Sequence, residues 1–92
     1  MYVILVYDIK YDNGGAKIWR NVFKSCKKYL HHIQNSVFEG ELSKSQIFNL
    51  KYEIKGYIRD DVDSVIIFKS RNKRWLDKEI WAKDDDATSN FI

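Results

Sequence analysis

The chain opens on an apolar run, Met1 to Tyr7, that ends at a single carboxylate, Asp8. The run has the length and composition of a β-strand, and its alternating positions are apolar on both faces. A strand with two apolar faces lies inside a sheet, where other layers cover it. The opening run therefore predicts a central strand over residues 2–8, with a helix on one side and a second covering layer on the other.

Length and composition limit the chain to one small domain. It has 92 residues, of which 45% are hydrophobic and 32% charged, a balance typical of globular rather than disordered proteins. With no proline and only four glycines, the sequence indicates regular elements without a flexible linker. We expect the folded domain over residues 1–83 and a polar tail over residues 84–92 that frays.

Two helices are predicted from apolar residues at three- and four-residue spacing. The first covers about residues 16–29, after the turn signal Asp12-Asn13-Gly14-Gly15, and its core stripe consists of Trp19, Val22, Phe23, Cys26 and Leu30. The second covers about residues 44–56, with a core stripe of Ile47, Leu50 and Ile54. Ser43 and Gln46 have the spacing of a capping box at the start of this second helix.

Three further segments have strand character. Residues 31–38 are predicted as the second strand, ended by Glu39-Gly40-Glu41. Residues 62–69 are predicted as the third, and their continuous apolar run indicates another central strand. A short alternating segment over residues 75–81 follows as an extra strand.

The order of these elements, with a strand-like crossing before the second helix, predicts the fold class. It is an α+β, ferredoxin-like βαββαβ sandwich with a short extra C-terminal strand. Both helices then cover one face of an antiparallel sheet, and apolar side chains on the other face have no internal partner. A twofold homodimer that packs sheet against sheet would bury them.

Asp8 is the candidate catalytic and metal-binding residue. An acid at the end of an apolar strand requires solvent, a partner or a cation, and a cap on the following turn is the simpler alternative. One carboxylate is a poor magnesium site, but two copies of Asp8 across a dimer axis could share one Mg²⁺ that polarises a phosphodiester. Asp12 and Glu39 are candidates for outer-shell roles, with ordinary surface positions as the alternative for each.

Cations gather around the first predicted helix. Residues 1–30 carry a local charge of +4 within a chain of formal charge +3, and the candidate nucleic-acid-binding residues are Lys10, Lys17, Arg20, Lys24, Lys27 and Lys28. A second cluster follows the third strand and consists of Lys69, Arg71, Lys73 and Arg74. Such surfaces attract polyanions, although a solvated helix face is the plainer interpretation.

Several other sites are disfavoured by the sequence. The single cysteine, Cys26, excludes an internal disulfide, fits a reducing compartment and is interpreted as a core residue. His31 and His32 are adjacent in a strand, so they cannot both face one ion, and we assign them to structure or at most to phosphate contact. Tyr7 and Tyr11 flank Asp8 and could contact phosphate oxygens, although core packing explains Tyr7.

Location follows from the same reasoning. The opening apolar run is too short to span a bilayer and lacks a basic leader, so we expect a cytoplasmic protein that does not associate with membranes.

Four segments together resemble a known family. They are Met1–Ile9, Gln34–Leu42, Asp63–Phe68 and Lys73–Ile80. In this order and spacing they are similar to the small CRISPR-associated adaptation proteins of the Cas2 family. The resemblance implies a ferredoxin-like homodimer whose last strand pairs with the partner's sheet. It also implies a magnesium-dependent endonuclease that acts on single-stranded RNA or double-stranded DNA, with Asp8 matching the metal-binding acid contributed by each subunit.

The resemblance also supports a second hypothesis. Members of the family serve as the central dimer that bridges the CRISPR spacer integrase while DNA lies across the basic surface, so the chain could be a non-catalytic DNA-binding scaffold. The first hypothesis remains a dimeric nuclease that acts in spacer acquisition for antiviral defence. A third, an RNA-binding or ligand-sensing module, is disfavoured because the third strand lacks the glycine–aromatic pattern of an RNA recognition motif.

Overall fold

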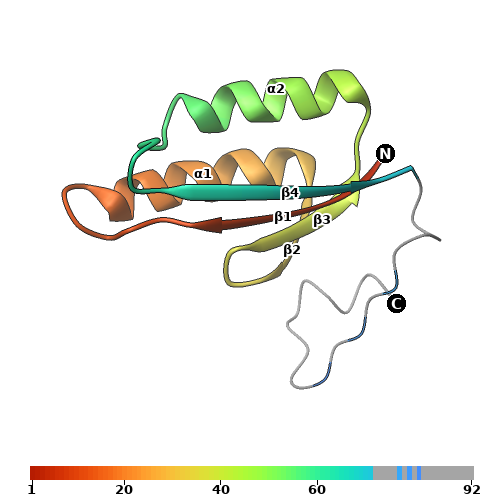
Figure 1. The fold of residues 1–92 in the computed structure, drawn as a ribbon, viewed down its shortest axis with the longest axis horizontal. Coiled ribbons are helices and arrows are strands. Elements are labelled where there is room, and N and C mark those ends of the chain that lie inside the picture. The colour runs from red at the N-terminus through yellow and green to blue at the C-terminus, as the bar shows by residue number, and fades with distance from the viewer. Residues whose placement is uncertain (72–76, 78, 80, 82–92) are drawn as a thin grey trace.

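A computed structural model describes residues 1–71, 77, 79 and 81 of the chain. Six elements follow one another in these residues, and Figure 1 shows their arrangement. They are β1 (Tyr2–Asp8), α1 (Gly15–Tyr29), β2 (His31–Gln34), β3 (Val37–Glu41), α2 (Lys44–Lys55) and β4 (Ser64–Ser70). The predicted tail over residues 84–92 lies outside the described residues. So does the predicted extra strand over residues 75–81, apart from residues 77, 79 and 81. No helix among the described residues is long and apolar enough to cross a membrane.

The four strands form one antiparallel sheet in the order β2-β3-β1-β4. β1 lies between β3 and β4, as the two apolar faces of the opening run predict. Leu5 in the middle of β1 is opposite Phe38 of β3 on one side and Ile67 of β4 on the other. Both helices lie on the same side of the sheet (Figure 1), which confirms the ferredoxin-like α+β architecture.

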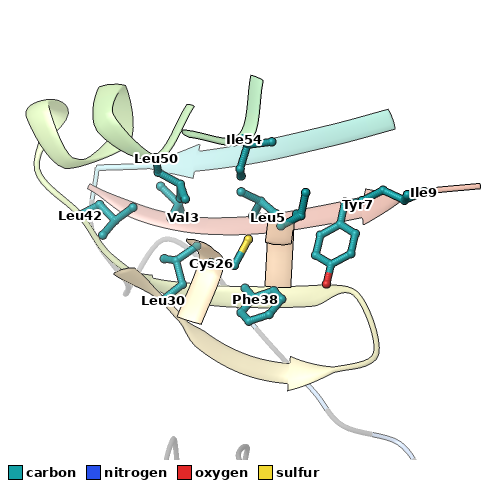
Figure 2. Close-up of a cluster of buried hydrophobic side chains, with 11 residues drawn as sticks. Val3, Leu5, Tyr7, Ile9, Cys26, Leu30, Phe38, Leu42, Leu50 and Ile54 are labelled. Atoms are coloured by element: carbon teal, nitrogen blue, oxygen red, sulfur yellow. The ribbon is translucent and has the colours of Figure 1, made fainter. Parts of the chain in front are cut away.

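The core occupies the space between the helices and one face of the sheet. Val3 and Leu5 of β1 point into it, where they meet Cys26 of α1 and Leu50 and Ile54 of α2 (Figure 2). Because side chains alternate along a strand, Tyr7 also points toward the helices, and it is only 3% exposed. The intervening residues of β1 therefore point to the opposite face.

We call that opposite face the open sheet face and define it by Ile4, Val6, Ile66 and Phe68. Ile4 is opposite Phe68 and Val6 is opposite Ile66 across the β1–β4 pair, so the four side chains share one surface. Ile66 is 51% exposed and Phe68 is 58% exposed, whereas Val65 and Ile67 on the helix side are half-buried. A sheet with helices on one side thus presents an apolar surface on the other, as the sequence predicts.

Two strand predictions are wrong. Residues 31–38 are not one strand but the hairpin of β2 and β3, because Asn35 adopts a left-handed backbone conformation (φ 42°) that reverses the chain. β3 then continues through Glu39-Gly40-Glu41 instead of ending there. Among the described residues β4 is an edge strand rather than a central one, and its apolar run reflects the open sheet face.

Both helices begin and end close to their predicted limits. α1 begins one residue earlier than predicted, at Gly15, and α2 ends one residue earlier, at Lys55. The capping box of α2 is present: the Gln46 backbone amide donates to Ser43 Oγ over 3.2 Å, and Gln46 Oε1 accepts from the Ser43 amide over 2.9 Å.

Candidate functional site

Asp8 is the last residue of β1 and is exposed. It lies opposite Ser64, the first residue of β4. Because Tyr7 points toward the helices, the Asp8 side chain belongs to the other side, so its carboxylate stands at the edge of the open sheet face beside Val6 and Ile66. The predicted catalytic acid is therefore accessible to solvent, to a cation or to a second copy of the chain.

The backbone after Asp8 turns tightly into α1. Asn13 and Gly14 both have positive φ, 48° and 88°, as a close reversal requires. Gly15 then passes so close to the backbone of Lys10 that a Cβ atom on it would lie 1.6 Å from the Lys10 carbonyl oxygen. The glycines of the turn signal are thus needed to bring the start of α1 against the end of β1.

Arg59 and Asp63 hold this loop in place. Arg59 Nε donates to Asp63 Oδ2 over 3.1 Å, and Arg59 Nη2 donates to Asp63 Oδ1 over 3.0 Å. The same guanidinium reaches across to the loop, where Nη2 donates to the Lys10 carbonyl over 2.7 Å and Nη1 donates to the Asp12 carbonyl over 2.9 Å. We call this arrangement the Arg59–Asp63 clasp.

The carboxylate of the clasp is buried and fully engaged. The side chain of Asp63 has no exposed surface, and it also accepts from the backbone amides of Arg59 (2.8 Å) and Lys10 (3.3 Å). The hydrogen bonds and charge of Arg59, together with those amides, hold the pKa of Asp63 below its usual value. Asp63 is therefore ionised at neutral pH, but none of its oxygens faces outward as a free ligand.

The candidate outer-shell acids do not gather around Asp8. Asp12 is exposed in the loop, with its carboxylate 3.5 Å from Arg59 Nη1. Glu39 is fully buried, which contradicts a surface position, and it accepts a hydrogen bond from the Tyr2 hydroxyl. Glu39 is opposite Ile4, four positions along β1 from Asp8.

A metal site within one copy of the chain is incomplete. Among residues 1–71, 77, 79 and 81, no three His, Cys, Asp or Glu side chains converge on a common point. Asp8 supplies the oxygen ligand that Mg²⁺ prefers, so its chemistry fits this cation, but one carboxylate does not make a protein site. The donor set fits a divalent cation only when a second oxygen-bearing surface faces the open sheet face.

The predicted nucleic-acid-binding cations are all exposed, but the five on α1 lie on the other side of the sheet from Asp8. Lys17, Arg20, Lys24, Lys27 and Lys28 follow one face of α1, and α1 packs on the helix side of the sheet. Asp8 and the basic face of α1 are therefore not parts of one surface. Lys10, in the loop directly after β1, is the candidate cation nearest to Asp8 in the chain.

Lys28 has a partner that the sequence does not reveal. Its Nζ atom lies 2.6 Å from Glu53 Oε1 of α2, and this bond raises the pKa of Lys28. Glu53 also accepts from Ser25 Oγ over 3.0 Å and from the Tyr29 hydroxyl over 2.7 Å. Lys28 therefore helps to join α1 to α2, and it is less available for phosphate than the other cations on this face.

Three other sequence candidates have structural roles: Cys26, His32 and Tyr7. Cys26 is fully buried, and burial raises the pKa of its thiol to about 12, so it is a core residue and not a nucleophile. His32 packs against Phe23 and Phe38, and its Nε2 atom lies 2.8 Å from the Asn35 carbonyl oxygen. His31 is exposed, Tyr7 is in the core and Tyr11 is 69% exposed beside the turn.

Sequence reasoning missed Arg59 and Glu53. The spacing of Arg59 and Asp63 is that of an ion pair on a helix, but these residues lie in the connection between α2 and β4. Glu53 interrupts the lysine-rich surface of α2 and shows no partner at helical spacing in its own element. Its partners come from α1, so only the packing of the two helices brings them together.

The fold and the site define a class of protein: a small ferredoxin-like chain with an exposed acid at the end of its central strand and a cationic helix on the other side. Residues 1–78 match the family described as CRISPR associated protein Cas2. The "CRISPR-associated endoribonuclease Cas2" of Fusobacterium nucleatum subsp. nucleatum is 61% identical over 92 residues, which cover all of this chain and 87% of that protein. The "CRISPR-associated endoribonuclease Cas2 2" of Moorella thermoacetica is 41% identical over 91 residues, 98% of this chain and all of that one.

A solved structure gives the same result. The protein described as "Crystal structure of cas2" superposes with a TM-score of 0.80 at 40% identity, and the match covers 94% of this chain and 91% of that one. The chain therefore belongs to the CRISPR-associated Cas2 family. This confirms the family, the fold class and the CRISPR-associated nuclease class predicted from the sequence.

Proposed function

We propose that the protein is a homodimeric, magnesium-dependent endonuclease that cleaves single-stranded RNA, with Asp8 of both protomers at one shared metal site. The observation that carries this proposal is the place of Asp8: an exposed carboxylate at the edge of an exposed apolar sheet face. RNA is favoured because the two similar relatives above are named endoribonucleases.

Dimerisation through the open sheet face would bring two copies of Asp8 together. Ile66 and Phe68 are more than half exposed, and such a contiguous apolar surface is typical of an interface. A twofold contact places the same patch of each subunit against the other, and an axis that passes beside the Asp8 end of the patch would bring the two carboxylates together. Two carboxylates with like charge then favour a cation between them.

Within such a site the residues of this chain would bind the cation and orient the nucleic-acid strand. The two Asp8 carboxylates would hold the cation, and Lys10, exposed two residues after Asp8, would contact a phosphate oxygen of the bound strand. When bound, Mg²⁺ supplies Lewis-acid polarisation of the scissile phosphodiester. The exposed position of Asp8 leaves room for a nucleic-acid backbone to approach the axis.

The role in CRISPR defence extends this proposal beyond the cleavage reaction. We place the dimer in spacer acquisition, in the cytoplasm, with the CRISPR spacer integrase as its protein partner. The buried, unreactive Cys26 suits a reducing compartment.

The test is cleavage of a labelled single-stranded RNA in Mg²⁺ by the parent protein and by Asp8→Ala, each free of contaminating nuclease. We expect the variant to lose at least about 100-fold in rate, because the loss of a direct ligand removes several kcal/mol of charge stabilisation. Asp61→Ala, which removes another exposed aspartate, is the matched control and keeps full activity. Equal rates for the parent and Asp8→Ala would remove Asp8 from the mechanism.

One observation supports a second candidate function, a non-catalytic scaffold that holds double-stranded DNA. The exposed cations of α1 lie on the opposite side of the sheet from Asp8, so a polyanion can bind there without reaching the acid. A scaffold predicts that Asp8→Ala retains both duplex binding and spacer acquisition in cells. A nuclease whose cleavage is needed for acquisition predicts that this variant binds DNA but fails to acquire spacers.

A further inference from the structure

The Arg59–Asp63 clasp joins the two strand ends that flank Asp8. Asp8 is opposite Ser64, so the end of β1 and the beginning of β4 lie side by side. Asp63 immediately precedes Ser64, and it accepts from the Lys10 amide two residues after Asp8. The clasp therefore fixes the backbone on both strands within two residues of the Asp8 pair.

Arg59 fixes the loop at two further points. Its guanidinium donates to the carbonyl oxygens of Lys10 and Asp12 over 2.7 and 2.9 Å. The Asp12 carbonyl also accepts from the Gly15 amide over 3.0 Å, at the first residue of α1. One planar side chain thus joins three segments: the segment before β4, the loop after β1 and the start of α1. A lysine, with a single ammonium group, cannot reach all of these acceptors at once.

We propose that Arg59 is a positioning residue that sets the location of Asp8 for metal binding. This inference rests on the proposed function, because it assigns Arg59 to the shared metal site of the dimer. Arg59 does not touch the cation or the RNA: it acts by holding the strand end from which Asp8 projects.

In a symmetric site, the hold of Arg59 on the loop after β1 affects both Asp8 carboxylates. Asp8 is exposed at a strand end, where the ladder that orders β1 stops. Two carboxylates that share one small cation must be placed to within about 0.5 Å, and a displacement in one protomer is repeated in the other by the twofold axis. A small relaxation of the loop therefore alters both halves of the site at once.

The test compares Arg59→Lys with Glu53→Gln in the full-length protein. Arg59→Lys retains the positive charge but loses the planar fork that reaches Asp63, Lys10 and Asp12. Glu53→Gln is the matched control, because it weakens a second network that joins elements, between α1 and α2 and on the helix side of the sheet. For each protein the Mg²⁺ concentration at half-maximal cleavage, kcat and the KM for RNA are measured, together with amide hydrogen exchange of residues 9–15.

We expect Arg59→Lys to raise the half-saturating Mg²⁺ concentration by about tenfold, in the range seen when groups that orient metal ligands are removed. The KM for RNA stays within about twofold of the parent value, and the amides of residues 9–15 exchange about tenfold faster. Glu53→Gln leaves both the Mg²⁺ dependence and the exchange of this loop unchanged, even where it lowers the melting temperature equally.

The outcomes separate this inference from the function on which it rests. Parental Mg²⁺ dependence in Arg59→Lys, with cleavage still lost in Asp8→Ala, overturns the positioning role and leaves the nuclease intact. An equal rise in the Mg²⁺ requirement for Arg59→Lys and Glu53→Gln also overturns the positioning role, because a general loss of stability would then explain the weaker Mg²⁺ binding. A parent protein without Mg²⁺-dependent cleavage overturns both. If Arg59→Lys does not fold, Asp63→Glu, which keeps the charge but shifts the carboxylate, takes its place with the same expected results.

Discussion

Asp63 carries a negative charge inside the protein, and its partners determine what that charge does for stability. Arg59 and two backbone amides stabilise the ionised form, so the pKa of Asp63 is lower in the folded chain than in the unfolded one. A group of this kind stabilises the fold above its unfolded pKa, about 3.9 for aspartate. The contribution is lost as the pH falls through the lower folded value.

Asp63→Asn tests this residue-scale argument. At pH 7 we expect the variant to lose about 2 kcal/mol in the free energy of unfolding, because charged hydrogen bonds are replaced by weaker ones. The difference should begin to shrink below about pH 4, where the unfolded parent chain takes up a proton at this carboxyl, and should disappear below the lower folded pKa. Urea unfolding at pH 7, 5 and 3 and at one protein concentration measures it. Asp60→Asn, whose exposed carboxylate is 3.2 Å from Lys55 Nζ, should change stability by less than about 0.5 kcal/mol at each pH. A loss of unfolding free energy in Asp63→Asn that is the same at every pH would contradict the claim that Asp63 is ionised in the folded protein.

At the scale of elements, α1 has one face in the core and the other covered by cations. Arg20 and Lys24 are exposed in the middle of this outer face, whereas Lys28 is paired with Glu53. If the outer face binds nucleic-acid phosphates, Arg20→Glu/Lys24→Glu should weaken binding of a double-stranded DNA at least about tenfold at 50 mM salt. The slope of log K against log salt should become shallower by about one to two.

A second charge reversal controls for the change in net charge. Lys44→Glu/Lys51→Glu alters two exposed lysines of α2 by the same total charge. Fluorescence anisotropy at several salt concentrations compares the two double variants with the parent protein. Similar losses for both would mean that only net charge matters, and the outer face of α1 would then not be a specific contact surface.

The elements also show how far the sequence can be interpreted without a structure. Apolar periodicity places both helices to within one residue and identifies β1 as central. It succeeds because regularly spaced apolar side chains must face the core. It fails at residues 31–38, where a single left-handed residue, Asn35, divides one apparent strand into two. It also fails at Glu39, whose burial depends on neighbouring strands and a tyrosine from β1.

The candidate site shows the same division between local and long-range information. Asp8 is found from the sequence because an acid that ends an apolar strand is conspicuous within a few residues. The clasp is not, because Arg59 meets Lys10 and Asp12 across separations of 49 and 47 residues. That contact exists only once β1 and β4 are paired.

At the scale of the whole molecule, the open sheet face links the stability of the proposed dimer to Mg²⁺-dependent cleavage. Phe68 is 58% exposed and lies opposite Ile4 on the same surface whose edge carries Asp8. If this face is the dimer interface, Phe68→Asp places a charge in the apolar seam, where an unpaired charge costs at least about 2 kcal/mol. The dimer dissociation constant should then rise by about 30-fold or more. Sedimentation equilibrium over a range of protein concentrations measures this change.

Tyr52→Asp is the matched control for this substitution. Tyr52 is 77% exposed on α2, so the change removes an aromatic ring that is more exposed than Phe68 and adds the same charge on the helix side of the sheet. We expect it to leave self-association unchanged. Because a shared cation needs two copies of Asp8, Phe68→Asp should also lose Mg²⁺-dependent cleavage in proportion to its loss of dimer and regain it as the protein concentration rises. Cleavage by a monomeric Phe68→Asp protein at the parental rate would show that one Asp8 is sufficient, and the symmetric site would have to be abandoned.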